Sequence, residues 1–184
     1  LDSSLKGLIN KSSDDINTTF ETEKIVNKLQ KDILNYLLRL SKSPLNDDER
    51  FTTDLLFHTV NDIERVSDHA ENIAELAQNS IELNLVFSED ALYEISEVYE
   101  KAMSNFKNSL IALDKHDLNL ARKILEVEKE VNLLEKSFRK SHMDRLNLNL
   151  CTIDSGVLYF DLLSNLERIS DHASNIAKQV LKIE

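Results

Sequence analysis

Apolar positions recur along the chain with the period of helices and not with the alternation of strands. From about residue 14 to residue 42, apolar side chains return every three or four positions. The same period continues through residues 47–83, 88–113, 118–147 and 153–183. A period near 3.6 predicts five long helices, and the short segments between them predict antiparallel neighbours in a bundle.

The first nine residues predict the end of a further helix. Leu1, Leu5 and Leu8 lie on one helical face, and Ser12 then offers an N-cap to the next helix. Two Gly and one Pro among 184 residues leave few helix breakers. Together with the periodicity, this composition predicts an all-α fold.

A twelve-residue segment occurs twice, as ERVSDHAENIAE at 64–75 and ERISDHASNIAK at 167–178, with nine positions identical. The likeness extends to the helices before each copy, at offsets of 103 to 105 residues. We therefore predict two tandem three-helix up-down bundles, residues 1–83 and 84–184. The first bundle lacks most of its first helix, and the chain starts with Leu, so we expect residue 1 to lie inside a longer protein.

Each copy of the segment pairs two carboxylates four residues apart, and the preceding helix of each repeat pairs a carboxylate with an amide at the same spacing. Positions i and i+4 share one helical face, so facing helices would bring four oxygen-bearing side chains together. Such oxygens are ligands for Mg, Ca, Mn or Fe, and a nearby histidine would add a nitrogen for Zn or Fe. The candidate metal ligands are Glu23, Asn27, Glu64 and Asp68 in the first repeat, and Glu128, Asn132, Glu167 and Asp171 in the second.

Two other interpretations of these acids compete with a metal site. Acids at the border of a helical core are commonly solvated, and Arg65 and Arg168 stand next to them as partners for a duplicated salt bridge. Recurrence in both repeats favours a specific role, because solvation alone does not require the same side chain twice.

The neighbouring histidines and asparagines have their own expected roles. His69 and His172 lie about 100° around the helix from the acids before them, which favours packing or an interhelix hydrogen bond over metal ligation. Asn72 and Asn175 lie one turn beyond the acids and would bind a carboxylate, a water or a facing helix.

Charge and cysteine content exclude several classes of function. The chain has 22 Lys and Arg against 33 Asp and Glu, a net charge of −11, which argues against a nucleic-acid partner. The single cysteine, Cys151, fits a reducing, cytosolic compartment, and no apolar run has the length of a membrane span. No nucleophile stands with a base and no glycine-rich phosphate loop occurs, so we expect no enzyme.

The two repeated segments resemble the E-R-I-x-D-x-x-x-N-I motif of the PhoU family, and the acid-and-amide pairs match that family's second element. The resemblance implies two three-helix bundles, a regulatory role in phosphate uptake, and iron or zinc bound by the eight residues named above. Asn27 and Asn132 stand where several relatives have Asp, which lowers the negative charge of both sites.

Within the family, the chain looks most similar to the cytoplasmic PhoU-like domain of sodium/phosphate cotransporter-type proteins. We therefore expect a regulator that docks on a phosphate transporter membrane domain in the same chain, at the inner face of the membrane, without inserting into it. A homodimer is a further candidate partner. The near alternative is a stand-alone PhoU-type regulator of an ABC phosphate transporter and its sensor kinase, and a metal-dependent enzyme on bundle carboxylates is a more distant one.

Overall fold

A computed structural model describes residues 1–183, so residue 184, the last of the expected second repeat, lies outside the described part. These residues form helices and no strand. The helices are α1 (Asp2–Asn10), α2 (Ser13–Leu40), α3 (Asp47–Glu82), α4 (Glu89–Lys115), α5 (Leu118–Asn147), α6 (Ile153–Val180) and the short 3₁₀ helix η1 (Leu181–Ile183). The bounds expected from the periodicity agree with these to within a few residues, and the all-α prediction is confirmed.

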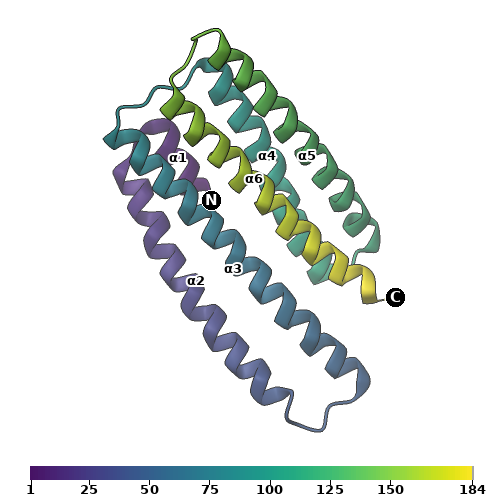
Figure 1. The fold of residues 1–184 in the computed structure, drawn as a ribbon. Coiled ribbons are helices and arrows are strands. Elements are labelled where there is room, and N and C mark those ends of the chain that lie inside the picture. Colours follow the sequence, from purple (N-terminus) through teal and green to yellow (C-terminus); the bar gives the residue numbers. More distant parts are fainter. Residues whose placement is uncertain (184) are drawn as a thin grey trace.

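The six helices are arranged as two three-helix bundles that share one long seam. Helices α1, α2 and α3 pack together, α4, α5 and α6 pack together, and α3 lies against α6 (Figure 1). Figure 1 shows α3 and α6 running in opposite directions through the middle of the molecule. The expected up-down layout of the two bundles is confirmed.

Local sequence explains where the helices begin. The Ser12 hydroxyl accepts a hydrogen bond from the backbone N–H of Asp15, at 3.3 Å. Asn46 and Glu49 form a reciprocal capping box at the start of α3, with both distances at 2.9 Å. Gly7 allows α1 to approach α2 closely, because a Cβ there would lie 2.7 Å from Cγ1 of Ile16.

The main hydrophobic core runs through both repeats. Ile73 and Ala74 of α3 belong to the same buried cluster as Ile95 of α4, Val131 of α5 and Leu166 of α6. All five side chains are at most 1% exposed. The two bundles therefore share one core, and the seam between α3 and α6 is part of it.

Within the described residues, the first bundle has a groove between α2 and α3 that no third helix covers. In the second bundle, α4 covers the equivalent groove with side chains such as Ile95 and Val98, which are fully buried. Helix α1 has only nine residues and does not reach that far. As a result Leu56 is 37% exposed, whereas Tyr159, its counterpart in the second repeat, is fully buried. A cavity of about 170 Å³ lies here, lined by Val26, Leu29, Gln30, Ile33, Val60 and Ile63.

A buried polar network holds α4 onto α5 and α6. The guanidinium of Arg145 donates to both carboxylate oxygens of Glu94, at 3.0 and 2.5 Å, and the Tyr159 hydroxyl donates to the same carboxylate. His142 stacks on Tyr159 with ring centroids 4.2 Å apart and is 1% exposed. Burial lowers the pKa of His142, and the Arg145 charge lowers it further. The first repeat has Leu37, Leu40 and Leu56 at the equivalent positions.

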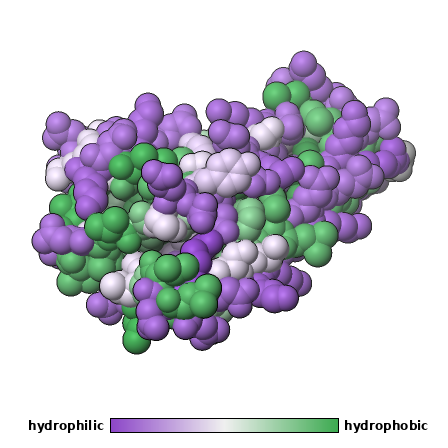
Figure 2. All heavy atoms as spheres, turned by 90° about the horizontal axis from the view of Figure 1, so that it is seen from above, coloured by the Kyte–Doolittle hydropathy of each residue, from purple (hydrophilic) through white to green (hydrophobic). Residues whose placement is uncertain are grey.

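Apolar side chains also reach the surface. Seen from above, they form patches between hydrophilic side chains (Figure 2). The loops that join α3 to α4 and α5 to α6 lie at one end of the bundles (Figure 1), and several of their apolar residues are more than half exposed. These are Leu83, Val86, Leu148, Leu150 and Ile153.

The first prediction concerns the buried network. Glu94→Leu leaves the Arg145 charge buried without its partner, so the free energy of unfolding should fall by about 3–5 kcal/mol. Glu94→Leu combined with Arg145→Leu should restore most of the loss, because apolar side chains replace a buried pair at little cost. Urea denaturation measures both, with Glu100→Leu on the exposed side of α4 as the control. An equal loss in the single and double variants would contradict this role.

Candidate acidic sites in the two repeats

The first site lies between α2 and α3. The Asn27 amide nitrogen donates to a Glu23 carboxylate oxygen on the same helix. Glu23 is only 6% exposed, and the Glu64 and Asp68 side chains on α3 are 18% and 30% exposed. Glu64 is near enough to both Glu23 and Asp68 for each to affect its ionisation. The helices therefore bring the two predicted pairs into one electrostatic cluster.

The second site repeats this arrangement between α5 and α6. The Asn132 amide nitrogen donates to Oε1 of Glu128 at 2.6 Å. The Glu167 side chain is 24% exposed and interacts electrostatically with Asp171 on its own helix and Glu128 on α5. Glu167 of α6 therefore lies near enough to Glu128 of α5 for the two carboxylates to interact electrostatically.

Burial and like charge act on the central glutamate of each site. Burial raises the pKa of Glu64, and the Asp68 carboxylate raises it further, partly offset by the Arg65 charge. Burial and the Asp171 carboxylate raise the pKa of Glu167 in the same way. Each glutamate thus carries a negative charge at a position where the folded protein disfavours it. A cation bound at either site would remove that penalty.

Each site also contains a buried acceptor without a donor. Oδ1 of Asn27 and Oδ1 of Asn132 are buried and have no hydrogen-bond partner among the described residues. An orphaned buried carbonyl oxygen costs free energy, so its recurrence at equivalent positions indicates a missing partner. Carboxylate and amide oxygens are ligands that hard cations prefer, and such a cation would be a suitable partner for the orphaned oxygens. The metal ligands named from the sequence remain a prediction.

The competing salt bridges are present but weak. Nη1 of Arg65 lies 3.4 Å from Oδ2 of Asp68, and Nε of Arg168 lies 3.9 Å from Oε2 of Glu167. Both arginine side chains are more than 60% exposed, so these pairs contribute little. Across residues 1–183, no three or more His, Cys, Asp or Glu side chains stand close enough together to form a metal site by themselves.

Sequence reasoning missed one further carboxylate at each site. Glu71 lies near Glu23 and Asp68, and burial with these charges raises its pKa. Glu135 affects the ionisation of Glu167 in the second site. Each lies three residues, about one turn, beyond a predicted ligand of its helix, which is the signal that would have found it. Their counterparts in the other repeat are Ser174 and Gln30, so the two sites are not identical.

The histidines of the repeated segment face the seam between α3 and α6 and not the acidic sites. Nδ1 of His69 lies 2.9 Å from Oδ1 of Asn165, and Nδ1 of His172 lies 2.9 Å from Oδ1 of Asp62. Burial lowers the pKa of His69. The expectation that the histidines make interhelix hydrogen bonds is correct.

The two asparagines of the segment support these bonds. Asn72 donates to the oxygen of Asn165 that His69 contacts, at 3.1 Å. Asn175 donates to the carboxylate of Asp62, at 3.4 Å. Each thus binds the facing helix, as the sequence suggested.

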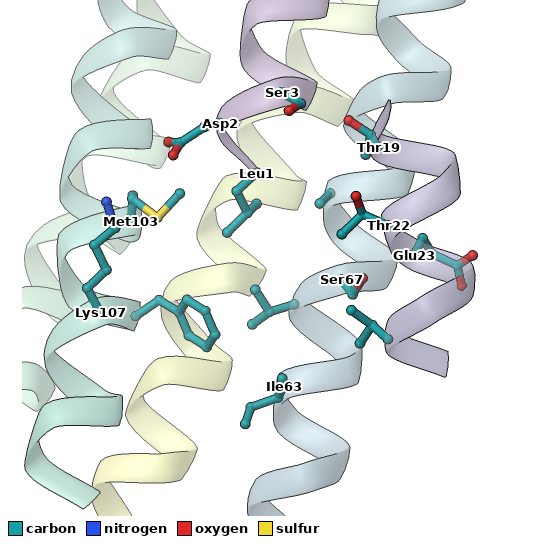
Figure 3. Close-up of a pocket in the computed structure, with 14 residues that line it drawn as sticks. Leu1, Asp2, Ser3, Thr19, Thr22, Glu23, Ile63, Ser67, Met103 and Lys107 are labelled. Atoms are coloured by element: carbon teal, nitrogen blue, oxygen red, sulfur yellow. The ribbon is translucent and has the colours of Figure 1, made fainter. Parts of the chain in front are cut away.

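The cavity drawn in Figure 3 adjoins the first acidic site, and Glu23 of that site is among the residues that line it. It has a volume of about 390 Å³ and lies where α1, α2, α3 and α4 meet. Figure 3 shows Glu23 turned away from Leu1 and Lys107, which lie on the opposite wall. Val26 and Ile63 line both this cavity and the smaller one described above, so the two cavities are neighbours between α2 and α3.

Two joined three-helix repeats, each with an acid-and-amide pair facing an acid pair, define a duplicated helical-bundle protein. The chain belongs to the PhoU domain family, which matches residues 1–77 and 95–180. The family resemblance drawn from the repeated motif is thereby confirmed.

Individual relatives extend this comparison. The chain is 27% identical over 177 residues to "Putative inorganic phosphate export protein YjbB" of Escherichia coli, and it spans 31% of that protein's length. It is 24% identical over 166 residues to "Phosphate-specific transport system accessory protein PhoU homolog 1" of Thermotoga maritima, covering 89% of this chain and 70% of that protein. The crystal structure of PhoU from Pseudomonas aeruginosa has the same fold, with a TM-score of 0.92 at 22% identity, over 99% of this chain and 87% of that one.

These comparisons correct the expected partner. We expected a phosphate transporter membrane domain in the same chain, yet the PhoU proteins of T. maritima and P. aeruginosa match the chain over most of their own lengths. Within residues 1–183, no helix combines the length and apolar character that crossing a membrane requires. The prediction of a same-chain transporter domain is therefore withdrawn. The resemblance to cotransporter-type proteins in particular is also left without support.

The second prediction follows from the raised pKa values of the central glutamates. A carboxyl group with a raised folded-state pKa binds its proton more tightly in the folded protein, so its contribution to stability falls as pH rises through that range. Glu64→Gln and Glu167→Gln should therefore stabilise the metal-free protein at pH 7, by at least a few tenths of a kcal/mol each. The gain should shrink at lower pH, where the native glutamates take up protons.

Urea denaturation in the presence of a chelator, at several pH values, measures this effect. Glu126→Gln, an exposed position on α5, is the matched control and should change little. Destabilisation at pH 7 by both site variants would show that the carboxylates are well paired without a metal.

Proposed function

We propose that this chain is a PhoU-type regulator of a phosphate-specific transport system, acting through protein contacts and not by catalysis. The observation that carries the proposal is the duplicated acidic site on a PhoU fold, together with family membership over most of the chain. Relatives named as accessory proteins of phosphate-specific transport systems support it. It would act in the cytoplasm, at the inner face of the membrane where such a transporter is reached.

Metal binding at the two acidic sites is part of the proposal. Glu23, Asn27, Glu64 and Asp68 would hold one ion or cluster, and Glu128, Asn132, Glu167 and Asp171 would hold the other. The support is the orphaned amide oxygen and the buried glutamate that recur in each. Iron or zinc, as the resemblance implies, would neutralise the acids and draw the two helices of each site together.

Binding to the transport machinery tests the regulatory function. The purified chain should bind the cytoplasmic ATP-hydrolysing subunit of the phosphate transporter or the sensor kinase from the same cells, and its deletion should change phosphate uptake. Normal uptake in the deletion strain, with no binding to either protein, would reject the function. Loss of metal binding alone would not contradict the regulatory function.

The third prediction addresses the metal sites. Asp68→Asn with Asp171→Asn removes one carboxylate charge from each site, so added iron or zinc should no longer raise the melting temperature. Asn27→Asp with Asn132→Asp should do the opposite and tighten binding, because each adds a charge to an oxygen-ligand site. Thermal denaturation and elemental analysis measure both effects.

The control for the third prediction is Asp154→Asn, an exposed acid at the start of α6. The metal sites would be rejected if wild-type protein carried no metal and neither pair of substitutions altered the response to added ions.

A further inference from the structure

The seam between α3 and α6 contains a histidine pair that the acidic sites do not use. His69 and His172 occupy equivalent positions in the two repeats, and their ring centroids lie 5.5 Å apart. Each ring reaches across the seam to a residue two turns before the other histidine. The two rings therefore sit on either side of the pseudo-twofold axis that relates the repeats.

Hydrogen bonds determine which nitrogen of His69 carries the proton. The Asn165 amide nitrogen donates to the backbone carbonyl of Asp161 at 2.8 Å, so the Asn165 atom facing His69 is the oxygen. An amide oxygen only accepts, and therefore Nδ1 of His69 is the donor. In a neutral ring, Nε2 is left with a free lone pair.

The same reasoning applies to His172. Its Nδ1 faces a carboxylate oxygen of Asp62, which also accepts from Asn175. Nδ1 is again the donor and Nε2 keeps its lone pair. Among the described residues, each histidine has a hydrogen-bond partner at Nδ1 and none at Nε2. The seam thus contains two Nε2 lone pairs that no described residue uses, on rings whose centroids lie 5.5 Å apart.

The separation of the rings fits a shared cation. A Zn–N bond is about 2.0–2.1 Å long, so two imidazoles bound to one tetrahedral zinc through Nε2 have centroids about 5 Å apart. The observed centroid distance is 5.5 Å, with the planes inclined by 32°.

The hydrogen bonds that Nδ1 of each histidine makes are of the kind found in metal-binding histidines. A ligating histidine almost always donates its other ring N–H to a carboxylate or an amide or backbone oxygen, which orients the ring and raises its basicity. Asp62 plays that part for His172 and Asn165 plays it for His69. The Asp62 and His172 side chains are 15% and 18% exposed, which leaves the pair reachable from solvent.

We propose that His69 and His172 form a binding site for a borderline divalent cation such as Zn²⁺ at the α3–α6 seam, with water completing the coordination. The site uses nitrogen ligands, and so differs from the acidic sites, whose oxygen ligands suit hard cations. Having two protein ligands, it would bind more weakly than a four-ligand structural zinc site. A cation here would tie the two repeats together at their axis.

The fourth prediction is that His69→Gln with His172→Gln weakens Zn²⁺ binding at this site at least tenfold. Glutamine keeps an N–H that can donate to Asn165 or Asp62, so the seam should stay folded, as circular dichroism would verify. Isothermal titration with Zn²⁺ at pH 7.5 measures the change in a metal-stripped chain whose acidic sites are already removed by Glu64→Gln, Asp68→Asn, Glu167→Gln and Asp171→Asn. Asp62→Asn should weaken binding by about tenfold or more, because it alters only the outer partner of His172.

Two control variants separate this site from others. His58→Gln with His116→Gln removes two exposed histidines and should leave the titration unchanged. Replacing the acids of both acidic sites, Glu64→Gln, Asp68→Asn, Glu167→Gln and Asp171→Asn, should also leave seam binding intact. Loss of binding in that variant, but not in His69→Gln with His172→Gln, would overturn the proposal.

A measurement on the unmodified chain gives an independent test. One equivalent of Cu²⁺ bound at the seam should show electron paramagnetic resonance splittings from two imidazole nitrogens. A spectrum with oxygen ligands only, or with nitrogen splittings that persist in His69→Gln with His172→Gln, would overturn the proposal even if that variant folded poorly.

Discussion

The packing of α3 against α6 is the constraint on which the rest of the structure depends. Both helices contribute to the single core, and each carries a copy of the twelve-residue segment. Because successive residues of a helix point about 100° apart, the segment directs its side chains toward two different neighbouring helices. Glu64 interacts electrostatically with Glu23 of α2, whereas His69 and Asn72 contact Asn165 of α6. The seam thereby sets the position of both acidic sites relative to each other.

The two acidic sites share the same acid-and-amide pairing but differ in the side chains around it. In both, an amide nitrogen is used by a neighbouring carboxylate and the amide oxygen is left without a donor. The additional acid is Glu71 in the first site and Glu135 in the second, and the latter is also paired with Arg139. Duplication preserved the pair that faces the neighbouring helix, and divergence changed the side chains around it.

Much of the fold and some of the electrostatic contacts within the acidic sites could be predicted from the sequence. Helix periodicity and the Ser12 cap located the helices, and the i, i+4 spacing identified acids that interact electrostatically, such as Glu64 and Asp68. Glu71 and Glu135 lie one turn beyond a predicted ligand of their own helix, but the prediction did not follow the spacing beyond the i, i+4 pairs. The Glu94–Arg145 pair could not be predicted, because 51 residues separate its partners and no local pattern marks either one.

The uneven covering of the two bundles has a consequence for local unfolding. Among residues 1–183, the second bundle is closed by α4 and by a buried ion pair, whereas the far halves of α2 and α3 have neither. Segments with fewer buried contacts open at lower free energy than the global transition. The first acidic site bridges these two helices near the point where their cover ends, so a ligand held there would act as a clamp on the part of the molecule that opens most readily.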